Sequence, residues 1–285
     1  MMAAPGPPRA ASWQQPIERI GSAISGGLGT LHRGVAYLGG VVRLLLTIGV
    51  CVVRAPRGGV HRIRLESVVH QCVRVGVRSI PIILLVQIFI GIILALNLAP
   101  TLDTYGQLER VADVVAIAVF RELGALITAV ILSGYAGASI AAELGAMVEG
   151  EEIKALRAHA LDPIRFLVVP RVVATTLMMV GLTVIADVIG VCGGMLTGVF
   201  VLDVSAVAYI EQTRVALSMT DYITGLVKGG VFGAIIAALA CYEGLTVSGG
   251  AEGVGRATTT TVVKSIVCLI GADCIFTALF YVAGW

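Results

Sequence analysis

The chain alternates between long apolar stretches and short polar connections. Five stretches are long and apolar enough to cross a bilayer, since one crossing takes about 20 residues of helix. They lie near residues 80–100, 112–140, 164–200, 222–244 and 260–283. This pattern predicts an all-α integral membrane protein with five transmembrane helices.

A further apolar run, 35–53, precedes these stretches and carries Arg43 at its middle. The run is long enough to cross, but a helix that lies in the interface with its arginine among the headgroups costs less free energy. We therefore expect an interfacial N-terminal helix within 35–78. Residues 1–30 begin with a Pro- and Ala-rich stretch and contain no apolar core of a signal peptide, so they predict a flexible tail before a membrane domain at 31–285.

The connection between the second and third stretches is too polar for a bilayer, yet it has the pattern of a helix. Residues 149–160 read EGEEIKALRAHA, and Ile153, Leu156 and Ala160 fall on one narrow apolar face. A charged helix of this kind is typical of an element that docks onto another protein. Its acidic residues therefore indicate a solvated or docking face and not a catalytic or metal site: Glu149, Glu151 and Glu152.

Cationic residues gather at alternate connections. Six arginines lie between 54 and 78, ahead of the first stretch, and Arg110 follows it. Four cations lie between 154 and 171, whereas Arg214 is alone in the next connection. Because cytoplasmic loops are enriched in Lys and Arg, this alternation places the N-terminus, the charged helix and the 245–258 loop in the cytoplasm. The C-terminus is then periplasmic.

Composition supports a membrane protein that is not an enzyme by itself. The chain is 57% hydrophobic and 13% charged, against about a quarter charged residues in soluble domains. Its net charge of +2 does not favour nucleic acid. The sequence contains no nucleotide-binding loop, and its four histidines and six cysteines show no metal-ligand spacing. We therefore expect no metal, and no cofactor bound by this chain.

Small residues recur every fourth position in two of the stretches. In lipid, close approach through small residues is a main source of helix association. The pattern favours packing within one chain over a seam between two copies, although it allows both. The residues are Gly190, Gly194, Gly198, Gly225, Gly229 and Gly233.

Five ionisable residues lie at membrane depth: Arg121, Glu122, Asp187, Lys228 and Asp273. Each is costly in hydrocarbon unless it is paired or faces a cavity. They are either structural ion pairs, Arg121 with Glu122 and Lys228 with Asp273, or the polar lining of a substrate path. An alternative function is an ion- or proton-coupled secondary transporter that uses Asp187, Lys228 and Asp273 as a relay.

Several motifs in order along the chain resemble the MlaE/YrbE permeases, over about residues 30 to 283. They are FRELG at 120–124, AELGAM at 142–147, EEIKAL at 151–156, Asp162-Pro163, Pro170-Arg171, GVGRATT at 253–259, Val262-Val263 and Asp273.

The resemblance implies a permease subunit of an ABC transporter in the bacterial inner membrane. Such permeases move lipids, here most simply phospholipids, between that membrane and a partner protein with an MCE domain. The implied fold is an interfacial helix, five transmembrane helices and a cytoplasmic coupling helix after the second. Two permease copies or paralogues pair around a lipid cavity, and separate ATPase subunits supply ATP and Mg²⁺.

The resemblance also assigns roles to residues. The coupling helix would run from Glu149 to Ala160, although this chain has Glu152 where many relatives carry Gln and Ala160 where many carry Gly. Its contacts to the ATPase would be Glu149, Glu151, Glu152, Ile153, Ala155, Leu156 and Ala160. The lipid cavity would be lined by Arg121, Glu122 and Lys228, with Ile88, Ile92 and Leu96 as an apolar wall or as ordinary lipid-facing surface.

Overall fold

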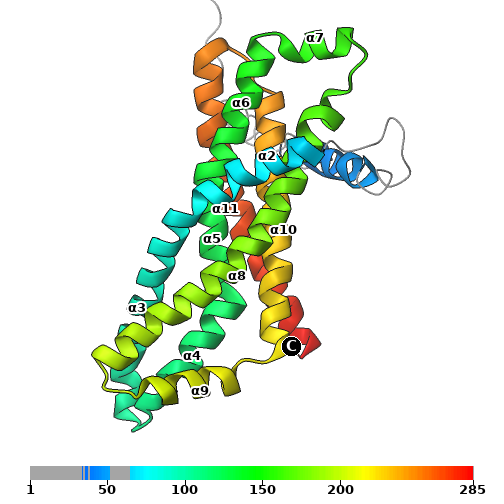
Figure 1. The fold of residues 1–285 in the computed structure, drawn as a ribbon. Coiled ribbons are helices and arrows are strands. Elements are labelled where there is room, and N and C mark those ends of the chain that lie inside the picture. The colour runs from blue at the N-terminus through cyan, green and yellow to red at the C-terminus, as the bar shows by residue number, and fades with distance from the viewer. Residues whose placement is uncertain (1–33, 35, 38, 52–64, 285) are drawn as a thin grey trace, which may run out of the picture. The chain divides into compact units, whose positions relative to one another are not determined.

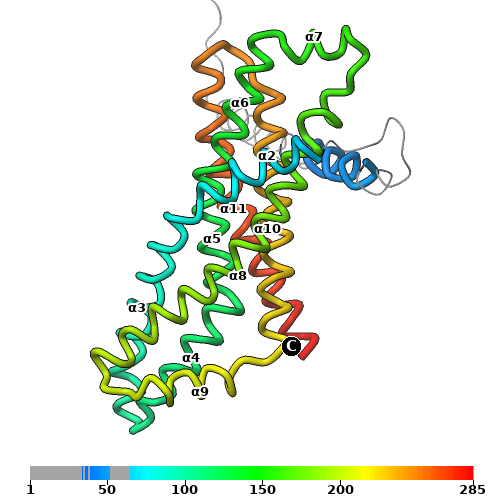
Figure 2. Tube along the Cα trace, in the orientation of Figure 1, coloured from blue at the N-terminus to red at the C-terminus, as the bar shows by residue number. Residues whose placement is uncertain are grey.

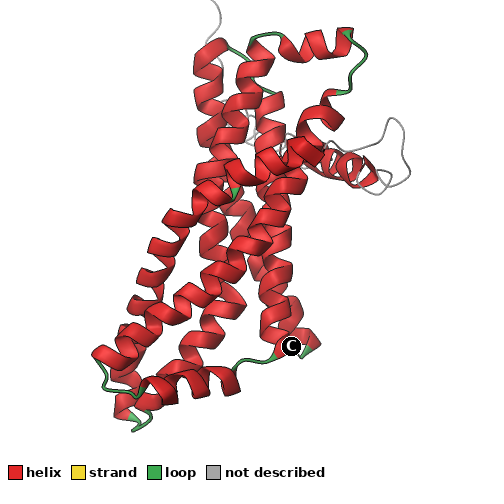
Figure 3. Cartoon of the chain, viewed as in Figure 1, coloured by secondary structure: helices red, strands yellow, loops and turns green. Residues whose placement is uncertain are grey.

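The computed structural model describes residues 34, 36–37, 39–51 and 65–284, and the chain divides into two compact units, 1–46 and 47–285. The predicted tail 1–30 lies outside the described residues. A short apolar helix covers Gly39–Cys51. This described part of the helix is shorter than the roughly 20 residues that a crossing needs. All secondary structure in the described part of the chain is helical (Figure 3).

Five helical stretches of the second unit are long and apolar enough to cross a membrane, which confirms the predicted fold class. The first comprises α2 (Leu65–Val75), η3 (Val77–Ser79) and α3 (Ile80–Thr104). The second comprises η4 (Leu108–Arg110), α4 (Val111–Ala118), η5 (Val119–Leu123), α5 (Gly124–Leu132), η6 (Ser133–Gly137) and α6 (Ala138–Glu149). The third comprises η7 (Ile164–Val168) and α8 (Val169–Phe200), and the last two are α10 (Met219–Leu245) and α11 (Gly250–Ala283).

Three of these segments are single π-helical turns: η5 and η6 lie inside the second stretch, and η7 begins the third. A π turn inserts one residue into the α-helical repeat and so re-aims the side chains around it, frequently at a functional site. The first of them, η5, contains both Arg121 and Glu122. The sequence pattern did not predict these turns.

Helix α8 packs along both α3 and α10, and α10 also packs along α6 and α11 (Figure 1). Glycines lie at these contacts. A Cβ atom added to Gly225 of α10 would overlap the carbonyl oxygen of Phe120 in η5, and one added to Gly233 would lie 2.7 Å from Cβ of Met179 in α8. Both glycines therefore allow a close approach of helices within one chain.

Helix α9 (Ala206–Ala216) lies in the connection between α8 and α10 and was not predicted. It packs against α4, and its Tyr209 is buried to 1% exposure. A Cβ atom at Gly194 or Gly198 of α8 would come within 2.7 or 2.8 Å of the tyrosine side chain. These two glycines thus make room for an aromatic ring that holds α9 in place.

The charged connection forms helix α7, which covers Glu152–Ala158. The predicted helix from Glu149 to Ala160 is too long, because α6 continues to Glu149 and Glu151 has a left-handed backbone with φ of 61°. Ala160 lies beyond the helix with φ of 58°, so it does not share the apolar face of Ile153 and Leu156. Helix α7 lies at the end of this unit opposite to α9 (Figure 2).

Candidate functional site

Lys228 is the centre of a buried polar network that joins three of the membrane-spanning stretches. Its Nζ lies 2.6 Å from Oε2 of Glu122 and 2.9 Å from Oδ1 of Asp273. The same ammonium group donates a hydrogen bond of 3.1 Å to Oγ1 of Thr277, whose hydroxyl donates to Glu122 over 2.8 Å. Lys228 is only 1% exposed, so its charge is stabilised almost entirely by these partners.

The local backbone explains how residues from three helices meet at this point. Glu122 lies in the π turn η5, and Gly225 allows α10 to approach that turn closely enough for Lys228 to reach it. Asp273 and Thr277 are four residues apart on α11, so both side chains lie on one face of that helix. The sequence reasoning missed Thr277, although its i+4 spacing from Asp273 was a usable signal.

Arg121 belongs to a second polar group next to the first. It forms an ion pair with Asp221, near the start of α10, and not with the adjacent Glu122. The interpretation of Arg121 and Glu122 as an ion pair is therefore incorrect, because neighbouring residues on a helix point in different directions. The Lys228–Asp273 pair is present.

Asp221 is held by the start of its own helix. Ser218 is the N-cap of α10, its hydroxyl accepts from the backbone N–H of Asp221, and the Asp221 carboxylate accepts from both the backbone N–H and the hydroxyl of Ser218. This reciprocal capping box fixes the position of the carboxylate that pairs with Arg121. The spacing Ser218-x-x-Asp221 was the sequence signal for a site residue that the prediction omitted.

The two polar groups border one cavity of about 120 Å³. One wall is polar and the other is aromatic, with the Phe280 ring centroid 6.0 Å from Nζ of Lys228. The cavity is therefore amphipathic, with a cation and a carboxylate on one side and apolar surface on the other. Its lining residues are Arg121, Glu122, Thr224, Lys228, Thr277, Phe280 and Tyr281.

The predicted apolar wall does not border this cavity. Ile88 and Ile92 are half-buried on α3, and Leu96 is exposed. Leu96 belongs to an exposed apolar face of α3 that also includes Leu85 and Phe89. In the described chain these residues are surface, so their role as a cavity wall stays a prediction.

Asp187 lies apart from the Lys228 network. It is 1% exposed, and its carboxylate oxygens have no hydrogen-bond partner among the described residues. Gly124 leaves room for this carboxylate, because a Cβ atom there would overlap Oδ1 of Asp187. In the alternative relay of Asp187, Lys228 and Asp273, the last two are therefore paired but Asp187 has no hydrogen bond to either of them. Within the described residues no group of three or more potential metal ligands was found.

Helix α7 offers a separate polar surface between the second and third spans. Ile153 is its one buried side chain and Leu156 is half-buried, whereas Glu149, Glu151, Glu152 and Ala155 are exposed. Glu151 and Lys154 form an exposed ion pair of 2.6 Å, and this hydrogen bond from Lys154 lowers the pKa of the Glu151 carboxyl. The pair contributes little to stability because water screens it, which leaves its charges available to a partner.

Comparison with known proteins shows which family the chain resembles. The family model "Permease MlaE" matches residues 68–279. A "Probable ABC transporter permease protein" of Rickettsia felis is 40% identical over 76% of this chain and 84% of its own length. The "Intermembrane phospholipid transport system permease protein MlaE" of Haemophilus influenzae is 34% identical over 73% of this chain and 80% of its own.

A plant protein also matches: "Protein TRIGALACTOSYLDIACYLGLYCEROL 1, chloroplastic" of Arabidopsis thaliana is 33% identical over 82% of this chain and 66% of its own length. The matched region contains all five apolar stretches in whole or large part, the Lys228 network and helix α7. The chain is therefore a multi-pass membrane protein that belongs to the MlaE permease family.

Proposed function

We propose that this chain is the membrane-spanning subunit of an ABC transporter that moves phospholipids. The observation that carries the proposal is the cavity at Lys228, in which buried charges face an aromatic wall. A phospholipid has the same division, since its headgroup carries charge and its acyl chains are apolar. The name of the Haemophilus influenzae relative, an intermembrane phospholipid transport permease, supports this substrate class.

The cavity holds a headgroup but not a whole lipid, because its volume is about 120 Å³. Acyl chains would extend onto apolar surface beside it. Helix α11 supplies such surface, since only 6% of its most apolar window is buried in the chain. We propose that a second permease copy or paralogue faces this surface and completes the cavity.

Energy would come from a separate ATPase subunit that docks on α7. The helix is short, charged and exposed, and it joins the second and third spans directly. A push on α7 therefore moves α6 and η7, which continue into the helices around the cavity. A partner with an MCE domain would exchange lipid with the cavity on the opposite side of the membrane, and the bacterial inner membrane would be the site of transport.

The lipid proposal is tested with the variant Lys228→Met. Quantitative mass spectrometry measures how much phospholipid remains with the purified variant and with the unaltered protein. We expect about a tenfold loss, because without the ammonium the uncompensated carboxylates of Glu122 and Asp273 repel the phosphate of a headgroup in the cavity. Lys264→Met is the matched control, since Lys264 also pairs with a glutamate, Glu243, at 2.7 Å. Equal phospholipid content in both variants and the unaltered protein contradicts the proposal.

The ATPase proposal is tested by reversing the charge of the α7 surface with Glu151→Lys and Glu152→Lys together. We expect the ATPase subunit to be lost from the purified complex, while membrane insertion is retained. Glu211→Lys on α9 is the control, because Glu211 is also exposed and lies on a helix at the other end of the unit. Unchanged recovery of the ATPase with the double variant rules out α7 as its docking element.

A further inference from the structure

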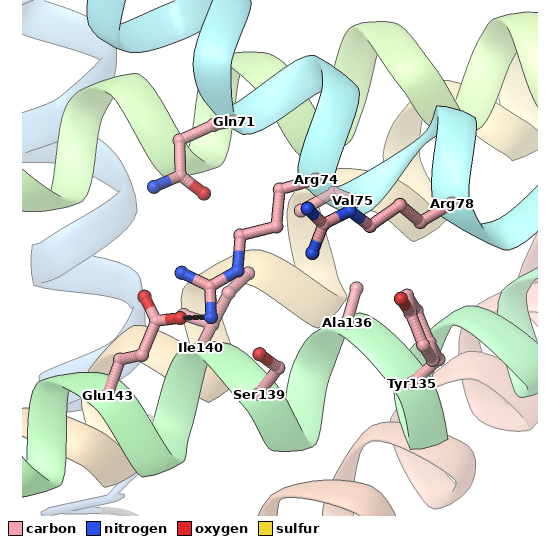
Figure 4. Close-up of a pocket in the computed structure, with 9 residues that line it drawn as sticks. All are labelled: Gln71, Arg74, Val75, Arg78, Tyr135, Ala136, Ser139, Ile140 and Glu143. Carbon is pink, nitrogen blue, oxygen red and sulfur yellow. Dashed lines mark ion pairs between the residues drawn. The ribbon is translucent and has the colours of Figure 1, made fainter.

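A second cavity, of about 140 Å³, lies between the start of the first span and the second half of the second span (Figure 4). We call it the arginine pocket. It is separate from the Lys228 cavity and shares no residue with it. Its lining residues are Gln71, Arg74, Val75, Arg78, Tyr135, Ala136, Ser139, Ile140 and Glu143.

The arginine pocket carries an excess of positive charge. Glu143 is its single acidic residue and is shared by two arginines, Arg74 from the pocket and Arg171 from α8 behind it. Arg78 adds a third cation and has no ion-pair partner in the part of the chain that the structure describes. Two guanidinium groups, Arg74 and Arg78, therefore line the pocket with one carboxylate that is already shared with Arg171, and this excess of positive charge favours an anion in the remaining space.

Neutral hydrogen-bonding groups complete the pocket. Figure 4 shows the Ser139 and Tyr135 side chains rising from the second span toward the arginines, and the Gln71 amide on the opposite wall, which α2 forms. Tyr135 and Ala136 lie in the π turn η6, which sets the direction of the tyrosine. Guanidinium, hydroxyl and amide donors around a small space match the oxygens of a phosphate group.

The position of the pocket identifies the source of that phosphate. Helix α2 borders the pocket and is amphipathic: Leu65, Val69 and Val73 recur every four residues and are 75%, 54% and 47% exposed. Such a helix lies in the membrane interface with its apolar face among the acyl chains. Gln71 and Arg74, on another face of α2, line the pocket, which places the pocket at the level of lipid headgroups.

The two cavities lie at different depths on the same span. Glu122 and Ser139 are 17 residues apart along the second span, which corresponds to about 25 Å of helix. The hydrocarbon core of a bilayer is about 30 Å thick. The arginine pocket and the Lys228 cavity are therefore near opposite faces of one membrane.

We propose that the arginine pocket binds the phosphate group of a phospholipid headgroup at the membrane face that carries α7. This inference rests on the proposed function and extends it, because it gives the protein a second lipid site besides the Lys228 cavity. A lipid bound there has its acyl chains against the exposed apolar face of α2 and α3, where Leu85 and Phe89 continue the stripe.

The test is a lipid titration of the purified full-length chain in detergent, followed by native mass spectrometry. It is made in the unaltered chain and repeated in the Lys228→Met background, where the other cavity contributes little, and the effect of Arg78 is expected in both. Arg78→Gln removes the unpaired guanidinium, Arg78→Lys retains the charge, and Arg214→Gln removes an exposed arginine on α9 as the matched control. The probes are phosphatidylglycerol, phosphatidylcholine, diacylglycerol and inorganic phosphate.

We expect Arg78→Gln to weaken phosphatidylglycerol and phosphatidylcholine alike by about tenfold, since both carry the phosphate. Arg78→Lys recovers most of the affinity, and Arg214→Gln changes nothing. Diacylglycerol, which has no phosphate, binds equally to all variants.

A loss confined to phosphatidylglycerol overturns the proposal, because it indicates attraction to net charge and not a phosphate site. An unchanged affinity for both phospholipids overturns it too. If inorganic phosphate binds as tightly as the phospholipids, with the same dependence on Arg78, the pocket is a site for free phosphate and the lipid assignment fails. The readout does not involve the ATPase or transport, so its failure is distinguishable from failure of the proposed function.

Discussion

Ala160 has a left-handed backbone conformation, which places its Cβ close to the following carbonyl oxygen. Glycine has no Cβ and adopts this conformation without that penalty. The resemblance to the MlaE/YrbE permeases implies glycine at this position in many relatives, and the backbone angle supplies a physical reason for that preference. The end of α7 is thus held in a conformation that its sequence does not favour.

We expect Ala160→Gly to stabilise the α7 region by about 1 kcal/mol, because it relieves the left-handed alanine. Ala158→Gly is the matched control: it lies in the last turn of α7, where glycine costs up to about 1 kcal/mol relative to alanine. Hydrogen exchange of the amides of 152–158 measures both effects. Exchange that slows or quickens equally in the two variants would exclude the backbone angle as the cause.

Lys228 shows at the same scale how a buried charge depends on its partners. Lys228→Met leaves Glu122 and Asp273 next to each other without a cation, so we expect a loss of about 3–5 kcal/mol in the free energy of unfolding. Asp273→Asn in the Lys228→Met background removes one of the two carboxylates and recovers part of this loss. Unfolding of the four variants of this double-mutant cycle measures the coupling. Strict additivity would contradict a direct Lys228–Asp273 interaction.

At the scale of elements, the π turn η5 connects packing to the candidate site. Phe120 in this turn packs against Tyr222 of α10, with ring centroids 5.1 Å apart, and Gly225 touches its carbonyl. Arg121 and Glu122 follow directly and reach Asp221 and Lys228 on that same helix. Contact between η5 and α10 therefore assembles both polar groups of the cavity.

Gly225→Ala is expected to separate these elements, because its Cβ would overlap the backbone carbonyl of Phe120, which has no flexible end to move aside. We expect a destabilisation of about 1–3 kcal/mol and a loss of retained phospholipid. Gly230→Ala on the same helix is the control, since its Cβ would make an ordinary contact of 3.5 Å with Val180. Equal behaviour of the two variants in thermal unfolding would show that the close approach at Gly225 is not required.

The sequence predicted the elements better than the contacts between them. The third span was expected at 164–200 and covers Ile164–Phe200, because apolar length alone defines a crossing. The π turns and the left-handed Ala160 depend on tertiary packing, which hydrophobic periodicity does not record. The cavity lining was predicted in part: Arg121, Glu122 and Lys228 were expected there and border it. Thr277 also borders it but contacts Glu122 across 155 residues, and Asp221 pairs with Arg121 across 100 residues, so neither was predicted.

For the whole molecule, the arrangement of the connections decides where each proposed partner can bind. Helix α7 and the 246–249 turn lie at one end of the five spans, whereas α9 and the last turn of α11 lie at the other (Figure 2). Both connections at the first end are adjacent to basic residues, Lys154 and Arg157 on α7 and Arg256 on α11. The positive-inside rule then predicts that this end is cytoplasmic, where ATP is present.

This orientation predicts a labelling pattern in a background in which the six native cysteines are replaced by serine or alanine. Ser248→Cys and Ala155→Cys are expected to react with a membrane-impermeant maleimide only after the cells are opened, because both lie at the cytoplasmic end. Gly106→Cys and Glu211→Cys are expected to react in intact spheroplasts, because the 105–107 turn and α9 lie at the opposite end. Ala155 and Glu211 are exposed in the isolated chain, and the cells used express it without the ATPase subunit, so that α7 is not covered by a partner. The reverse pattern would place α7 on the side without ATP and exclude it as the docking element of an ATPase, whatever its charge.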